Sequence, residues 1–123
     1  MMNRRWVVVI VFLFSLLAGR AFADQTSVSL EGPDEAINGS EVTIKVNVVH
    51  KGNHFFHYTS EVVVQANGTE IGRWEFSPWD KPEDQVFSRE ITYTVTGPTE
   101  ITATGTCNIH GSAGPAVLKI SVK

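Results

Sequence analysis

The chain has 123 residues, of which 42% are hydrophobic and 19% are charged. This length and composition suit one compact domain and exclude a disordered or fibrous chain. The formal net charge is −3, and the only cysteine cannot form an internal disulfide.

The first 23 residues have the pattern of an export signal. Two arginines precede an apolar run at residues 6–18, and the small-residue pattern Ala-Phe-Ala follows at residues 21–23. The apolar run is too short for a helix that crosses a bilayer, which needs about 20 residues. We therefore expect residues 1–23 to be cleaved and residues 24–123 to form one domain in the periplasm or outside the cell, without a stable membrane anchor.

Removal of this leader leaves 7 basic against 13 acidic residues, a net charge near −6. An acidic surface repels nucleic acid, so we expect no nucleic-acid partner. An unpaired thiol in an oxidising compartment is a liability unless something occupies it, and a metal is the commonest occupant. Cys107 is therefore either a metal ligand or a buried, inert side chain.

The mature chain predicts strands throughout, because apolar and polar residues alternate between Gly, Pro and Asn punctuation. Asn67-Gly68 favours a type I′ hairpin turn, and the segment from Pro78 to Asp84 reads as a surface loop. Short strands without crossover helices predict an all-β fold, a seven-stranded antiparallel immunoglobulin-like sandwich. The predicted strands lie at about residues 26–30, 41–49, 58–66, 69–76, 87–95, 101–107 and 118–122.

All four histidines and the cysteine lie in two short segments. A Cys-x-x-His pair at the end of a strand, followed by glycine, lets a thiolate and an imidazole face one point. The other segment begins where one predicted strand ends, so it can form a loop at one pole of the sandwich, where β-scaffolds present ligands. A single histidine is usually an ordinary surface residue, but this clustering predicts a shared metal site for zinc, iron or copper. The residues are His50, His54, His57, Cys107 and His110.

These residues resemble a known family. His57-Tyr58, together with the Cys-Asn-x-His-Gly motif at residues 107–111, is similar to the iron domain of superoxide reductase, the desulfoferrodoxin and neelaredoxin family. The resemblance covers roughly residues 31–111, and the Cys-Asn-x-His-Gly motif is its most specific part. It implies an immunoglobulin-like sandwich with a mononuclear iron held by four imidazoles in a plane and one axial thiolate, the sixth position being open to superoxide.

The resemblance implies that Cys107 is the axial thiolate and that His110, His50 and His57 are imidazole ligands. The loop from His50 to His57 is one residue longer than the family's His-x5-His spacing.

The family's remaining histidine lies upstream, and the corresponding place near residues 30–33 holds no histidine. Either His54 fills the vacancy from the longer loop, or Glu31 does so with oxygen. The total of four histidines and one cysteine favours His54.

The activity implied is reduction of superoxide to hydrogen peroxide by an exported oxidoreductase that cycles between Fe2+ and Fe3+. The additional four-cysteine iron site of some family members is absent, so an external electron-donor protein is implied. Trp74, Phe76 and Trp79 either shield the site or belong to the core. The alternative function is a non-catalytic metal-binding or electron-transfer module on the same fold.

We predict that the mature protein begins at Asp24, because the apolar run is too short to span a membrane and is followed by Ala-Phe-Ala. N-terminal sequencing of the exported protein checks this. Recovery of intact Met1 in the membrane fraction would contradict it.

Overall fold

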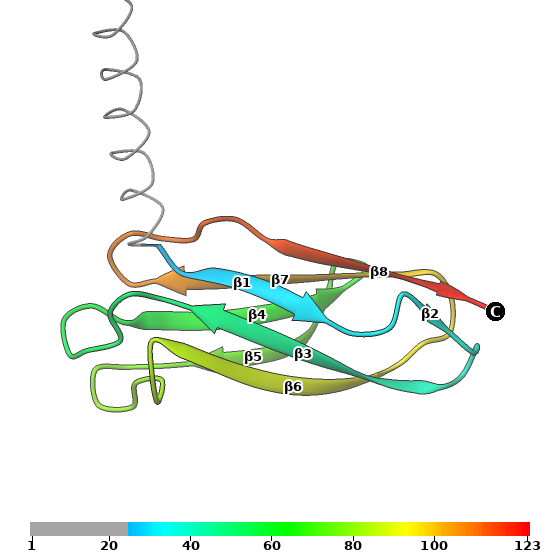
Figure 1. Cartoon of the computed structure of the whole chain (residues 1–123), viewed down its shortest axis with the longest axis horizontal. Helices are drawn as coiled ribbons and strands as arrows, with labels where there is room; N and C mark the ends of the chain where they lie inside the picture. Colours follow the sequence, from blue (N-terminus) through cyan, green and yellow to red (C-terminus); the bar gives the residue numbers. More distant parts are fainter. Residues whose placement is uncertain (1–24) are drawn as a thin grey trace, which may run out of the picture.

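The computed structural model describes residues 25–123, so the predicted export signal lies outside the described residues. This part of the chain contains strands and no helix, and therefore no helix that could cross a membrane. Eight strands follow one another along the chain (Figure 1): β1 (Ser27–Glu31), β2 (Glu35–Ala36), β3 (Glu41–Val49), β4 (Thr59–Ala66), β5 (Thr69–Glu75), β6 (Val86–Thr94), β7 (Thr99–Cys107) and β8 (Ala116–Val122).

The strands form two sheets packed as a sandwich. One sheet has the order β1-β3-β6 and the other the order β2-β8-β7-β4-β5, and β1 packs across the gap against β7 and β8. Every pairing is antiparallel except that of β2 with β8.

The count of eight corrects the expected seven, and the parallel pairing of β2 corrects the expectation of a purely antiparallel fold. β2 is a two-residue strand whose Glu35 and Ala36 pair with Ser121 and Val122. A strand this short leaves no alternation in the sequence, which is why pattern reading misses it.

The core lies between the two sheets and follows the predicted alternation. In β3, Ile44, Val46 and Val48 are fully buried while the residues between them face outward. Each such side chain contributes about 1.5–3 kcal/mol when buried. The Asn67-Gly68 turn between β4 and β5 has φ values of 50° and 84°, both positive as a type I′ turn requires.

The two sheets approach each other closely where β1 begins. A Cβ on Gly105 would lie 2.7 Å from the Thr26 side chain and 3.0 Å from that of Val28, so only glycine fits in β7 at this point. The contact keeps the start of β1 beside the end of β7. Thr26 is fully buried there, and its backbone N–H donates to the Gly111 carbonyl at 3.4 Å.

Three connections gather at one end of the sandwich, because β3, β5 and β7 end there and β4, β6 and β8 begin there. They comprise residues 50–58, 76–85 and 108–115. Both segments that carry the histidines and the cysteine therefore meet at the same pole (Figure 1).

Candidate metal centre

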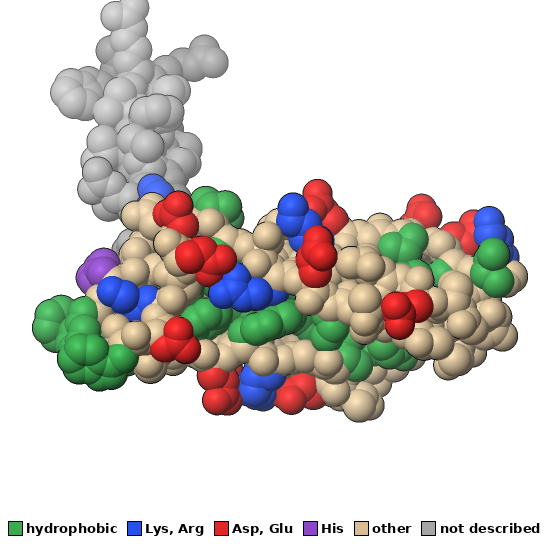
Figure 2. Space-filling model, turned by 90° about the horizontal axis from the view of Figure 1, so that it is seen from below, with side chains coloured by type: hydrophobic (Ala, Val, Ile, Leu, Met, Phe, Trp, Pro, Cys, Tyr) green, Lys and Arg blue, Asp and Glu red, His purple; other side chains and the backbone are tan. Residues whose placement is uncertain are grey.

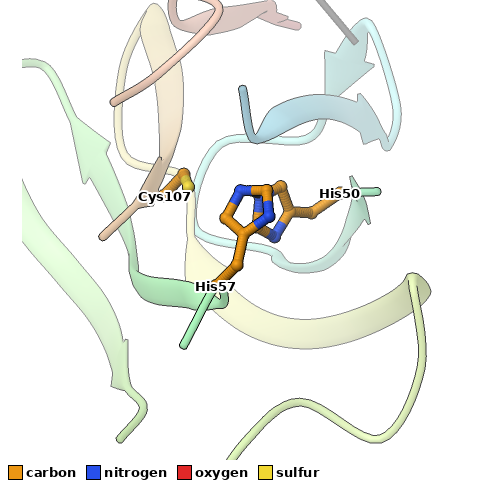
Figure 3. Close-up of side chains that lie close together, drawn as sticks. All are labelled: His50, His57 and Cys107. Atoms are coloured by element: carbon orange, nitrogen blue, oxygen red, sulfur yellow. Dashed lines mark hydrogen bonds between the residues drawn. The ribbon is translucent and has the colours of Figure 1, made fainter. Parts of the chain in front are cut away.

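Two histidines and the cysteine form the centre of this pole (Figure 3). The Nε2 atoms of His50 and His57 lie 3.1 Å apart. The ligand atoms of His50, His57 and Cys107 all lie within 4.8 Å of one another. His50 follows β3 directly and is fully buried, while Cys107 is the last residue of β7 and is also buried. Two imidazoles and one thiol at a single point form a donor set that suits zinc, iron or copper.

His110 extends this group. Its Nδ1 lies 3.1 Å from His57 Nε2 and 3.8 Å from Cys107 Sγ, and its ring is exposed. Imidazole nitrogens bound at right angles to one ion, at about 2.0–2.1 Å each, would be roughly 3 Å apart. The His50–His57 and His57–His110 distances are each of this size. Like His54, His110 lies outside the group of three residues whose ligand atoms are all within 4.8 Å of one another, so it borders this group through His57 and Cys107.

His54 lies beside the group without entering it. His54 and His57 face each other across a tight hairpin, in which the His54 N–H donates to the His57 carbonyl at 2.8 Å and the His57 N–H donates back at 3.1 Å. Their ring centroids are 5.6 Å apart, and His54 is exposed and is not among the three residues whose ligand atoms converge. The hairpin thus holds His54 next to the cluster, on its solvent side.

Glu31 does not reach the cluster. It ends β1 opposite Lys45 and accepts a hydrogen bond from Asn47 Nδ2 at 3.1 Å. Lys45 lies on β3, five residues before His50. At about 3.3 Å per residue, this spacing places Glu31 roughly 16 Å from the pole.

The start of β1 reaches the pole instead. Gln25 Nε2 donates to the His110 carbonyl at 3.2 Å. The buried hydroxyl of Thr26 lies 3.2 Å from that of Thr59, whose backbone pairs with Cys107. Gln25 and Thr26, to which the sequence analysis gave no role at the site, therefore contact the segments that carry the cluster.

The sulfur of Cys107 is surrounded by backbone N–H groups, as expected for a Cys-x-x-His-Gly turn. The N–H groups of Ile109 and His110 each donate to Sγ at 3.4 Å. Gly111 closes the turn at φ 73°, and its carbonyl accepts from the Cys107 N–H at 2.9 Å. Such hydrogen bonds to a cysteine sulfur tune the reduction potential of cysteine-ligated iron.

Asn53 fixes the orientation of His50, a role that the sequence did not reveal. Asn53 Oδ1 accepts from the Thr59 backbone N–H at 2.8 Å, and Nδ2 donates to the Asp84 carbonyl at 2.8 Å. These two bonds settle which side-chain atom of Asn53 is the oxygen. The same Oδ1 lies 2.9 Å from His50 Nδ1, so that nitrogen carries the proton and the lone pair of Nε2 faces His57.

Asn108 joins the two ligand-bearing loops. Its Oδ1 accepts from the Tyr58 N–H at 2.9 Å, and its Nδ2 donates to the Phe56 carbonyl at 3.2 Å. Its own N–H donates to the Tyr58 carbonyl at 3.0 Å. Asparagines next to the histidines and the cysteine were the available sequence signal for both Asn53 and Asn108, since their side chains bond readily to nearby backbone.

We predict that Asn53→Gly weakens metal binding, measured with ferrous iron as the probe, about 10- to 100-fold, because His50 loses the acceptor that orients it. Glycine accepts the φ of 56° at this position, so the backbone is not strained. Asn53→Asp keeps an acceptor oxygen and should bind iron within a few-fold of the wild type. Iron titration with circular dichroism as the folding control measures this, and an unchanged affinity in the glycine variant would contradict the role of Asn53.

Comparison with known proteins establishes the fold. No family model matches the sequence, and a search of curated proteins finds no relative. The superoxide reductase (neelaredoxin) from Ignicoccus hospitalis is 19% identical, with a TM-score of 0.67 over 80% of this chain and 83% of that chain.

A superoxide reductase candidate from Thermotoga maritima is 23% identical, with a TM-score of 0.63 over 79% of this chain and 86% of that chain. A CARDB domain from Pyrococcus furiosus, in complex with di-metal ions, is 20% identical, with a TM-score of 0.58 over 82% of this chain and 96% of that chain. The chain therefore shares the β-sandwich fold of superoxide reductases and also of a metal-binding CARDB domain.

Proposed function

We propose that the mature chain is an exported iron protein that reduces superoxide to hydrogen peroxide. The observation that carries the proposal is the convergence of His50, His57 and Cys107, with His110 beside them, at one pole of a sandwich shared with superoxide reductases. As part of the same proposal, we assign the sandwich to the immunoglobulin-like class. An external electron-donor protein would restore the reduced state after each turnover.

The residues of the pole have separate roles in this proposal. His50, His57 and His110 provide imidazole nitrogens, and Cys107 provides the thiolate. Bound iron would supply one electron to superoxide, which with two protons becomes hydrogen peroxide. The buried His50 and Cys107 anchor the group from inside, while the exposed His110 leaves its outer side accessible to a small anion and to protons from water.

His54 is our candidate for a further ligand. It is the fourth histidine of the chain, and its exposed ring lies beside that of His57. Glu31 is not proposed, because the pairing of β1 with β3 places it far from the pole.

A second candidate function is a non-catalytic metal-binding or electron-transfer module. The CARDB neighbour, which is a sandwich in complex with metal ions, favours this reading. Measuring superoxide consumption by the iron-loaded protein separates the two functions, because a module would bind metal and exchange electrons without consuming superoxide.

We predict that the iron-loaded protein consumes superoxide without releasing oxygen.

We also predict that Cys107→Ser abolishes the visible absorption band of the ferric form, because this band would arise from charge transfer between sulfur and iron. Serine is close to cysteine in size, and the core does not depend on the thiol, so the variant should remain folded by circular dichroism. An unchanged absorption band would show that Cys107 is not a ligand, and iron binding without superoxide consumption would leave the module as the function.

We also predict that His54→Ala lowers iron retention at least about tenfold, whereas Glu31→Ala leaves it unchanged. Glu31 is a matched control, since it is a polar residue on the same sandwich outside the cluster. Metal analysis after dialysis against a chelator measures both variants. Full retention of iron by His54→Ala would show that His54 is not a ligand and would leave the four proposed protein ligands. Loss of iron in the Glu31→Ala variant would contradict the placement of Glu31 outside the cluster.

A further inference from the structure

We propose that four exposed apolar side chains around the candidate metal centre form the docking surface for a small one-electron donor protein. This inference rests on the proposed redox function and names the surface through which the electron would enter. The four residues, called the apolar rim below, are Phe55, Phe56, Trp79 and Ile109.

The apolar rim is unusually exposed for such large side chains. Trp79 is 86% exposed, Phe56 76%, Ile109 59% and Phe55 39%. Figure 2 shows hydrophobic side chains gathered at one end of the molecule next to a histidine. Contiguous patches of this kind on a soluble protein commonly mark an interaction site.

Contacts between two loops hold the rim in place. The Phe55 ring packs edge-on against both the Phe56 and the Trp79 rings, with centroids 5.0 Å apart in each case. Phe55 and Phe56 occupy the tip of the hairpin closed by His54 and His57. The three aromatic members of the rim therefore form an ordered surface that spans the residue 50–58 and 76–85 connections, and Ile109 lies in the third connection, residues 108–115.

The loop that carries Trp79 is anchored independently. Ser77 and Asp80 exchange two backbone hydrogen bonds of 3.1 Å around it. Further along, Glu83 accepts two hydrogen bonds from Arg89, at 2.8 and 2.9 Å, and these bonds lower the pKa of the Glu83 carboxyl. An interface whose side chains are ordered beforehand loses less entropy when a partner binds.

The rim directly adjoins the candidate ligands. Phe55 and Phe56 are the two residues between His54 and His57, and Ile109 precedes His110. The Phe56 carbonyl also accepts a hydrogen bond from the Asn108 side chain at 3.2 Å, and Asn108 is covalently linked to Cys107. A protein covering the rim would therefore be one hydrogen bond and a short length of chain from the sulfur. Electron transfer between proteins weakens steeply with distance, so this adjacency favours a redox partner.

The size of the rim also selects the partner. From the exposed fractions, the four residues offer roughly 550 Å². A partner that covered only these residues would double this to about 1,100 Å² of total buried surface, which is below the 1,200 Å² or more of stable complexes and in the range of transient redox encounters. A permanent dimer of this chain would need a larger surface.

The charges near the rim disfavour a membrane as the occupant. Lys51 and Lys81 are exposed beside it, but so are Asp80 and Asp84. Segments that bind anionic lipid are rich in Lys and Arg on their polar side. A mixed polar border around an apolar centre is instead the usual composition of protein–protein interfaces.

The reaction at this surface is the transfer of one electron from the reduced donor to the ferric protein. The donor becomes oxidised by one electron, and no bond is formed or broken. The expected donor is a small protein whose own redox centre lies close to an apolar area of its surface.

The test measures reduction of the iron-loaded ferric protein by two protein probes, reduced rubredoxin and reduced cytochrome c, and by dithionite as a small-molecule reductant. Phe56→Ser/Trp79→Ser is the test variant. Ile37→Ser is the control, because Ile37 is also an exposed apolar residue, 63% exposed, and lies outside the pole. We expect at least one protein probe to reduce the wild type and the control equally, and the test variant at least tenfold more slowly. Dithionite should reduce all three at the same rate.

Failure of the docking surface is distinguishable from failure of the proposed function. The docking proposal is overturned if neither protein reduces the wild type, or if the test variant is reduced as fast as the control. It is also overturned if the wild type co-sediments with vesicles of phosphatidylcholine and phosphatidylserine and the test variant does not. Superoxide consumption by the pre-reduced protein is measured separately. If that activity is absent while protein-mediated reduction still depends on the rim, the chain is an electron-transfer module and the docking surface stands.

Discussion

The pairing of Thr59 with Cys107, at the point where β4 and β7 reach the pole, positions His57, Cys107 and His110 relative to one another. β4 begins and β7 ends at this pair, but Asn108 continues the pairing by forming hydrogen bonds with both the N–H and the carbonyl of Tyr58. His57, two residues before Thr59, and His110, three residues after Cys107, therefore leave the sandwich side by side. A shift of one residue in this register would turn the Cys107 side chain, at the end of β7, to the other face of the sheet.

The second requirement is a buried imidazole with a defined orientation. Burying a polar ring costs free energy unless it is hydrogen-bonded. His50 is fully buried at the end of β3 and meets this requirement through Asn53, whose side chain also ties the loop to Thr59 and Asp84. These hydrogen bonds connect the loop to the strand that begins at Thr59 and to the neighbouring connection at Asp84. The exposed residues at the pole therefore lie next to a hydrogen-bonded loop. This arrangement suits a metal ligand, since the partner of one ring nitrogen determines what the other can bind.

Much of the fold is visible in the sequence, because a half-buried strand records its two faces as alternation. The bounds predicted for the strand at residues 41–49 agree with β3, and the two segments that carry His50 and Cys107 meet at one pole as expected. The sequence could not show that β1 pairs antiparallel with β3 from Ser27 opposite Val49. That register carries Glu31 away from the pole.

Side-chain roles that depend on tertiary contacts were also hidden. Asn53 and Asn108 act through hydrogen bonds to residues that only the fold brings near. Trp74 and Phe76 pack against the core, as one of the two readings allowed, whereas Trp79 is exposed on its loop. An aromatic residue is equally apolar in either place, so composition alone does not separate core from surface.

In the proposed function, Cys107 and the histidines of the pole hold one iron ion together. X-ray absorption spectroscopy of the iron-loaded protein at the iron edge tests this most directly, because it identifies the atoms bound to the metal without relying on activity. We expect one iron per chain with one sulfur neighbour and several imidazole nitrogens. Iron surrounded by oxygen and nitrogen with no sulfur neighbour would contradict it.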